Sequence, residues 1–215
     1  DDDMKKILPI IVPKKSDSAS MDMVVELLLM TGRSLPEVMM MLVPEAWEKH
    51  NSMNNSKKAF YNFNSCIMEP WDGPASIPFT DGKFIGALLD RNGLRPSRYT
   101  VTKDGYVIMS SETGVVDIKP DNVLSHGRLE PGKIFLVDME EGRIVNDDEI
   151  KEDIVSKRPY EDWINKNILQ YYQYYEPNLL FFEKSLHFHY CFLTIGIFVQ
   201  YIYCLLYTSP SPRDS

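Results

Sequence analysis

The chain is predicted to fold as an α+β domain, because helical patterns come first along the sequence and strand patterns follow. Between residues 17 and 67, apolar residues recur at the three- and four-residue spacing of one helix face. From residue 75 to residue 146, short runs of β-branched and aromatic residues alternate with glycine-containing turns. Such a separation of helices from strands is typical of an antiparallel sheet covered by helices.

Composition limits the classes of partner and compartment. The 215 residues can form one large domain or two small ones. A net charge of −8 argues against nucleic acid or an anionic membrane surface as a partner. The three cysteines, Cys66, Cys191 and Cys204, show neither metal-ligand spacing nor an even disulfide set, which favours a reducing compartment, either cytoplasmic or plastid. The acidic opening residues resemble neither a signal nor a transit peptide, so we expect the chain to start within a longer protein.

The helical part is predicted to follow one short strand. Ile7–Val12 is an apolar run closed by Pro13 and is predicted to be a buried strand. After the polar turn Ser16-Asp17-Ser18, one helix carries an apolar stripe, and Gly32 is expected to end it in a left-handed conformation. The stripe consists of Met21, Val24, Val25, Leu28 and Leu29.

Two further helices are predicted before the strands begin. Ser34 and Glu37 are three residues apart, as in a capping box, and open a short helix that Pro44 stops. A third helix carries its apolar side chains on one face, at Phe60, Phe63 and Ile67.

Residues 70–146 are predicted to form one antiparallel sheet. Its hairpin turns are expected at Asp81-Gly82, a dipeptide that suits a type I′ turn, at Asp104-Gly105 and at Glu141-Gly142. A last helix starts at Asp147, where acidic side chains suit the helix dipole, and Pro159 interrupts it. The strands are expected at Ala75–Phe79, Lys83–Leu89, Arg98–Thr102, Tyr106–Ser111, Lys133–Asp138 and Arg143–Asn146.

The stretch from Glu69 to Tyr99 is the most specific string of the chain and resembles the glutamine amidotransferase domain of glutamate synthase large subunits. The resemblance extends to Ser16-Asp17-Ser18-Ala19, Arg33-Ser34-Leu35-Pro36 and Arg158-Pro159-Tyr160. It implies that residues 1–165 are the later part of a class II amidotransferase domain. The fold that it implies is the four-layer αββα architecture of N-terminal-nucleophile hydrolases, here incomplete.

Asp17 is the candidate substrate-binding residue. In class II amidotransferases, the aspartate of a Ser-Asp-Ser/Thr turn accepts hydrogen bonds from the α-ammonium group of bound glutamine, and the resemblance assigns that role to Asp17. The alternative is a turn aspartate that caps the following helix. The chain departs from the family at Lys14 and Lys15, which occupy positions where the family usually has glycines.

No catalytic residue is assigned. Members of the family attack glutamine with the thiolate of an amino-terminal cysteine, whereas this chain begins with Asp1. The family's Asn-Gly oxyanion pair and the arginine that holds the glutamine carboxylate are expected upstream. Cys66 is expected to be a buried, inert thiol on a helix, so the fragment by itself is predicted to be inactive.

The loop from Arg91 to Pro96 invites comparison with a phosphate-binding loop, but no glycine-rich phosphate motif follows the strand. A structural loop is favoured, in which Gly93 takes a positive φ and Arg95 binds neighbouring carbonyls. The same interpretation applies to Glu112-Thr113-Gly114. His50 and His126 are expected in loops without metal partners.

Residues 166–215 are predicted to be a tail unrelated to the domain. Tyr190–Leu206 is a borderline membrane span on hydropathy, but Gln200 interrupts it and no basic flank orients it. Cys204–Asp214 resembles the translation of a sequencing adapter, and the preceding stretch an out-of-frame or intronic read. We therefore expect no genuine membrane segment and few contacts between this tail and residues 1–165.

Three functional hypotheses remain open from the sequence. The resemblance implies a glutaminase that supplies ammonia for the reductive amination of 2-oxoglutarate, with FMN and an iron–sulfur cluster in the full-length protein and none in this fragment. Its implied partners are L-glutamine, the remaining domains of the polypeptide and a small reductase subunit, while the electron donor is left open. The alternatives are a non-catalytic, membrane-anchored interaction module and another class II amidotransferase, such as the phosphoribosyl-transferring one.

Overall fold

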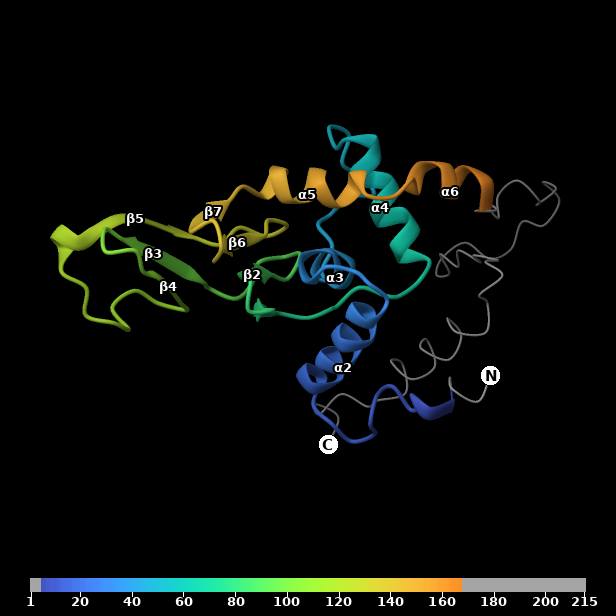
Figure 1. Cartoon of the computed structure of the whole chain (residues 1–215), viewed down its shortest axis with the longest axis horizontal. Coiled ribbons are helices and arrows are strands. Elements are labelled where there is room, and N and C mark those ends of the chain that lie inside the picture. The colour runs from blue at the N-terminus through green and yellow to red at the C-terminus, as the bar shows by residue number, and fades with distance from the viewer. Residues whose placement is uncertain (1–4, 168–215) are drawn as a thin grey trace, which may run out of the picture.

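The computed structural model describes residues 5–167. Most of its helices gather into one body, from which α2 projects on one side (Figure 1). The α+β class is confirmed, because helices precede the strands and two helices follow them. The helices are α2 (Asp17–Met30), α3 (Leu35–Leu42), α4 (Asn55–Ser65), α5 (Asp147–Ser156) and α6 (Tyr160–Asn167).

The strands form two antiparallel sheets, and not the single sheet that the sequence predicted. The four-stranded sheet has the order β1-β2-β6-β7 and the three-stranded sheet the order β4-β3-β5. The three-stranded sheet extends away from the helices (Figure 1). The strands are β1 (Ser76–Thr80), β2 (Phe84–Leu89), β3 (Arg98–Thr102), β4 (Val107–Ser110), β5 (Val123–Arg128), β6 (Phe135–Asp138) and β7 (Arg143–Val145).

The sheets separate because the chain leaves β2 through a loop and starts a new set of pairings. β3 pairs with β4 and with β5, while β6 returns to pair with β2. The sequence prediction missed β5, whose residues Val-Leu-Ser-His-Gly-Arg lack a continuous apolar run.

The main core lies between the helices and one face of the four-stranded sheet. Every residue of α3 is buried, so this short helix is the centre of the helical body. Its side chains meet α4, α5 and the inward-facing residues Leu88 and Leu136 of the sheet. The largest fully buried side chains are Phe60, Met40, Ile154 and Val38. The three methionines of α3 therefore fill the core.

A second, smaller core joins the two sheets. Ala87, Leu89 and Leu129 are buried there, on the face of β2 opposite to the helices. The side chains packed against them are Tyr99, Met109 and Phe135. The three-stranded sheet is therefore held to the rest of the fold by an apolar contact through β2.

Several local predictions are corrected by the structure. Ile7–Val12 forms no strand, and Pro9 within this run removes a backbone donor that a strand would need. Ser34 is the N-cap of α3, but its side chain makes no capping hydrogen bond, so the predicted capping box is absent. Gly32 does take the predicted left-handed conformation, with a φ of 83° directly after α2.

The hairpin turns are where the sequence predicted them, and one differs in type. Gly82, Gly105 and Gly142 all have a positive φ. Asp81 does not, so Asp81-Gly82 is not a type I′ turn. Instead, the Asp81 carboxylate accepts hydrogen bonds from the backbone N–H groups of Lys83 and Phe84, at 3.0 and 2.8 Å. This side chain closes a longer loop between β1 and β2.

Candidate functional site

The polar turn that holds Asp17 forms the start of α2. Ser16 is the N-cap, and its Oγ accepts a hydrogen bond from the backbone N–H of Ala19 at 3.3 Å. Ser16 Oγ also lies 3.1 Å from Ser18 Oγ, and Ser20 Oγ donates to the Ser16 carbonyl at 3.1 Å. The serines therefore organise the turn, and the alternative prediction that Asp17 caps the helix is wrong.

Asp17 is the first residue of α2 and is exposed. Its carboxylate makes no hydrogen bond or ion pair with any other residue in the range 5–167. It lies at the positive end of the helix dipole, which favours a negative charge. A carboxylate with this placement is available to accept hydrogen bonds from a cationic ligand.

The backbone before the turn is unusual. Lys14 has a φ of 63°, a left-handed conformation that glycine adopts without strain. Lys14 is one of the two lysines at which the resemblance leads us to expect a departure from glycine. Lys14 therefore adopts a backbone conformation that glycine favours.

One cavity among the described residues lies away from Asp17. It has a volume of about 580 Å³ and is formed by the starts of α4 and α5 and the connection from β5 to β6. Asp17 does not line it. The polar lining residues are Glu45, His50, Ser52, Asn54, Lys57, Tyr99, Arg128, Glu130, Lys133, Asn146, Asp147, Asp148 and Lys151.

The charged groups of this cavity are largely paired with one another. Lys151 is buried and lies 3.0 Å from Glu45 and 2.9 Å from Asp147. Lys57 lies 2.8 Å from Asp148, and this hydrogen bond and the lysine charge lower the pKa of the Asp148 carboxyl. Because these cations are neutralised within the fold, the cavity is a structural junction between α4, α5 and the β5–β6 connection.

A second buried ionic cluster joins two motifs that are far apart in the sequence. Glu37 Oε1 accepts hydrogen bonds from Arg158 Nη1 at 3.1 Å and from the Tyr160 hydroxyl at 3.2 Å. Arg33 Nε lies 3.6 Å from the same oxygen. The motifs that begin at Arg33 and Arg158, which carried the sequence resemblance, thus meet at one carboxylate.

The loop after β2 has the predicted positive φ at Gly93, but a different residue from the predicted one organises it. Gly93 has a φ of 62°, whereas Arg95 makes no hydrogen bond with any residue in 5–167. The buried carboxylate of Asp90 instead accepts hydrogen bonds from the backbone N–H groups of Ala75 and Asn92, at 3.0 and 3.1 Å. The expectation for Arg95 is therefore wrong.

The remaining candidates take no part in a site. Cys66 is the C-cap of α4 and is half-buried, and not fully buried as predicted. His126 lies within β5 and not in a loop, and both it and His50 are exposed. Within residues 5–167 there is no group of three or more His, Cys, Asp or Glu side chains that could hold a metal ion.

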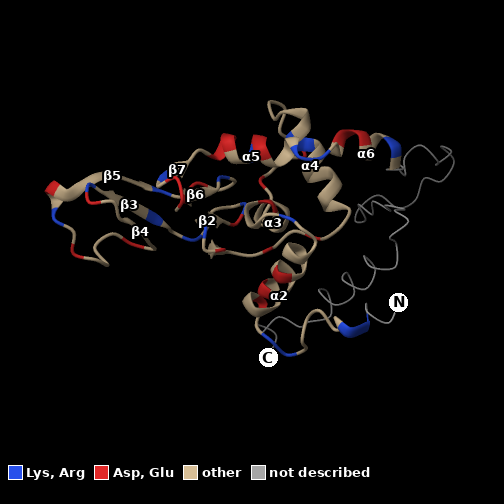
Figure 2. Cartoon of the chain, viewed as in Figure 1, with Lys and Arg blue, Asp and Glu red and all other residues tan. Residues whose placement is uncertain are grey.

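Sequence reasoning missed Glu37 and Lys151 as structural charges. Glu37 could have been identified, because it is the single charged residue in the otherwise apolar helix Leu35–Leu42. Lys151 carries no comparable local signal, since α5 is rich in charged residues, most of them acidic (Figure 2). Its partners Glu45 and Asp147 come together only in the folded chain.

No helix in the described part of the chain is both long enough and apolar enough to cross a membrane. The predicted borderline span at Tyr190–Leu206 and the adapter-like ending lie outside the described residues.

Comparison with known proteins identifies the family. The sequence profile described as "Glutamine amidotransferases class-II" matches residues 1–163. The large chain of glutamate synthase [NADPH] from Bacillus subtilis is 52% identical over 79% of this chain, and glutamate synthase [NADH] from Schizosaccharomyces pombe is 47% identical over 78%. Ferredoxin-dependent glutamate synthase from Antithamnion sp. is 46% identical over 76%.

The chain spans only 11%, 8% and 11% of the lengths of these three relatives. The matched part nevertheless contains the Ser16-Asp17-Ser18 turn, the loop after β2 and both motifs that meet at Glu37. The chain belongs to the class II glutamine amidotransferases and represents part of the amidotransferase region of a glutamate synthase large chain.

Proposed function

We propose that this region binds L-glutamine for the glutaminase reaction of a glutamate synthase, and that Asp17 accepts hydrogen bonds from the α-ammonium group of the substrate. The observation that supports this role is the exposed carboxylate of Asp17 at the start of α2, free of any partner within residues 5–167. The turn around it is built by serines, so the aspartate is not needed as a cap. Charge-assisted hydrogen bonds suit the recognition of an ammonium group.

The nucleophile of this reaction is proposed to lie outside the described residues. The only cysteine among residues 5–167 is Cys66, whose Sγ donates to the Asn62 carbonyl at 3.4 Å and lies at the end of α4. The proposal therefore assigns to this region the binding of glutamine, and the attack on its carboxamide to an amino-terminal cysteine elsewhere in the polypeptide.

The whole protein is proposed to release ammonia from glutamine and to use it in the reductive amination of 2-oxoglutarate, in the cytoplasm or a plastid. FMN and an iron–sulfur cluster would supply the electrons. The cluster does not fit residues 5–167, because clusters are held by several thiolates and this part has Cys66 alone. We assign both groups to other parts of the polypeptide.

The two sheets are proposed to belong to the β layers of an αββα fold. The helices cover one face of the four-stranded sheet, through Leu88 and Leu136. On the opposite face, Ala87 and Leu89 pack against Tyr99 and Met109 of the other sheet. One helical layer and the beginning of a sheet-to-sheet contact are thus present in this part of the domain.

The role of Asp17 is tested by substitution in the full-length polypeptide that carries this chain. Asp17→Ala is expected to raise the KM for glutamine about ten- to a hundredfold, because a charge-assisted hydrogen bond contributes about 1.5–3 kcal/mol. Asp22→Ala is the matched control, since Asp22 is another exposed carboxylate of α2, one turn further along. A KM that Asp17→Ala leaves unchanged would refute the proposal.

A further inference from the structure

Helix α2 is held to the described part of the fold by few contacts. Of its 14 residues, Val24 and Leu28 are buried, Met21 and Val25 are partly buried against the core, and its main packing partner is α3. At 1.5 Å per residue, the helix is about 20 Å long, so Asp17 lies about that far from the other end. The tilt of α2 is therefore set by this apolar contact together with the attachment of its C-terminal end.

That end is attached through a hydroxyl and a guanidinium group. Thr31, the C-cap of α2, donates from Oγ1 to the Leu28 carbonyl at 2.6 Å. The same Oγ1 accepts a hydrogen bond from Arg33 Nη1 at 2.5 Å. Arg33 thus reaches back to the last turn of the helix that carries Asp17.

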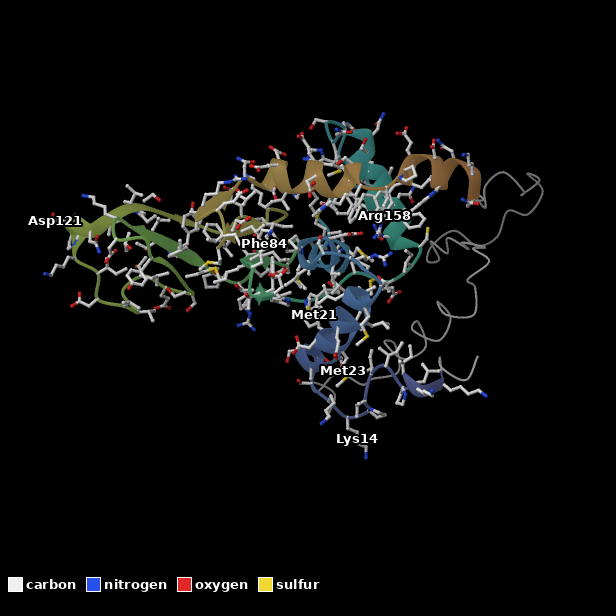
Figure 3. The ribbon with its side chains drawn as sticks, viewed as in Figure 1. Lys14, Met21, Met23, Phe84, Asp121 and Arg158 are labelled. Carbon is white, nitrogen blue, oxygen red and sulfur yellow. The ribbon has the colours of Figure 1, made fainter. Side chains whose placement is uncertain are left out.

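Arg33 is in turn attached to the helical body. Its Nε lies 3.6 Å from Glu37 Oε1 on α3, and the Glu37 side chain is only 4% exposed. The same carboxylate oxygen accepts from Arg158, which lies between α5 and α6, and from Tyr160, the first residue of α6. One carboxylate therefore connects α2, α3 and α6. In Figure 3, Arg158 lies in the helical body, whereas Lys14 lies beyond the opposite end of α2.

We propose that Thr31, Arg33, Glu37 and Arg158 are positioning residues for glutamine binding, because they set the tilt of α2 and so place Asp17. This inference rests on the proposed role of Asp17. A tilt of about 3° at one end of a helix of about 20 Å moves the other end by about 1 Å. A misplacement of about 1 Å in a substrate-binding group can cost as much as a hundredfold in rate.

The least disruptive test is made at Thr31, which is exposed, in the full-length polypeptide. Thr31→Val keeps the shape of the side chain but removes the link to Arg33, and Thr31→Ser keeps the hydroxyl. Thr31→Val is expected to raise the KM for glutamine about three- to tenfold, with kcat changed less than about twofold, and Thr31→Ser to restore the original KM.

Ser65→Ala is the matched control. Ser65 Oγ donates to the Asn62 carbonyl at 2.8 Å, so it makes the same bond to the third residue before it, at the end of α4. This hydroxyl has no connection to Arg33 or to α2. Its removal is expected to leave the KM for glutamine unchanged.

A double-mutant cycle separates positioning from general damage to the fold. If Thr31 acts through Asp17, Thr31→Val raises KM in the original protein but not in the Asp17→Ala background. Glu37→Gln tests the contact between Glu37 and Arg33, and it is likewise expected to raise KM in the original protein but not in the Asp17→Ala background. The inference is overturned if Thr31→Val and Glu37→Gln both leave KM unchanged. It is also overturned if both raise KM equally in the original protein and in the Asp17→Ala background. Failure of Asp17→Ala itself to raise KM refutes the proposed function instead.

Discussion

Lys14 is the only non-glycine residue in the described part of the chain with a positive φ. A left-handed conformation costs an L-residue about 1–2 kcal/mol, and glycine avoids this cost. Glycine also gives the unfolded chain more freedom, which lowers stability by about 0.5–1 kcal/mol and so cancels part of the gain. Lys14→Gly is therefore expected to raise the free energy of unfolding by up to about 1 kcal/mol, measured by urea unfolding of the 215-residue chain.

The neighbouring Lys15 provides the control for this prediction, since its φ is not positive. Lys15→Gly adds freedom to the unfolded chain without relieving strain, and is expected to lower the free energy of unfolding by about 0.5–1 kcal/mol. Equal losses of stability for both substitutions would show that Lys14 is not strained.

Tyr160, which belongs to the Glu37 cluster, is expected to make the stability of the fold depend on pH. Burial, followed by the negative charge of Glu37, raises the pKa of Tyr160 from 10.0 to about 12. A phenol whose pKa is higher in the folded state stabilises that state while it is neutral. This contribution, about 2–3 kcal/mol, is complete below pH of about 10 and is lost as the pH rises towards 12.

The measurement is alkaline unfolding of the chain and of its Tyr160→Phe variant. The variant is expected to lose less stability between pH 10 and pH 12 than the original chain, because it lacks the group with the raised pKa. It is also expected to lack one phenolate absorbance step near pH 12. Identical pH profiles for the two chains would contradict the assignment.

The site residues differ in how far their roles follow from sequence. Asp17 was placed at a helix start by the polar turn around it, and Ser16 and Asp17 do stand there. Glu37 fits the capping-box spacing with Ser34, yet its side chain turns inward to Arg158, which is more than a hundred residues away in sequence. Local spacing describes what a side chain can reach along its own helix, whereas a buried ion pair depends on the tertiary fold.

The packing of the four-stranded sheet requires a glycine at position 86. It lies opposite Phe79 on β1 and Leu136 on β6. A Cβ at this position would meet the ring of Phe79 and lie 2.9 Å from Leu136 Cδ1. Gly86→Ala is therefore expected to lower the free energy of unfolding by about 1–3 kcal/mol, as overpacking does in other cores.

A second substitution tests whether this clash is the cause. Phe79→Leu removes the ring that covers Gly86, so Gly86→Ala should cost less in the Phe79→Leu background than in the original chain. Urea unfolding of the four chains gives the coupling between the two positions. Additive losses of stability would indicate that the ring does not restrict residue 86.

The elements were easier to predict than their arrangement. Gly82, Gly105 and Gly142 were identified as turn residues because a positive φ is a local requirement. The division into two sheets depends on whether β3 pairs with β2 or with β5, and that choice lies in contacts between distant residues such as Tyr99 and Phe135. Sequence periodicity describes the faces of a strand but not its neighbours.

At the scale of the whole molecule, this region is similar in relatives that are named for different electron donors. The matched relatives are named for NADPH, NADH and ferredoxin, with identities of 52%, 47% and 46% to this chain. This region holds the exposed Asp17 at the start of the projecting helix α2, and a buried core to which that helix is attached. We propose that this region handles the nitrogen donor and that the choice of electron donor is made elsewhere in the polypeptide.

The most direct test of the central proposal compares glutamine with its analogue that lacks the α-amino group, in the full-length polypeptide. If Asp17 binds the α-ammonium group, this contact makes kcat/KM of the original protein about ten- to a hundredfold higher for glutamine than for the analogue. Asp17→Ala is expected to remove this difference. The variant should leave kcat/KM for the analogue unchanged, and Asp22→Ala should leave both values unchanged. An equal loss for both substrates on Asp17→Ala would contradict the proposal, because the aspartate would then not distinguish a substrate with an ammonium group from one without it.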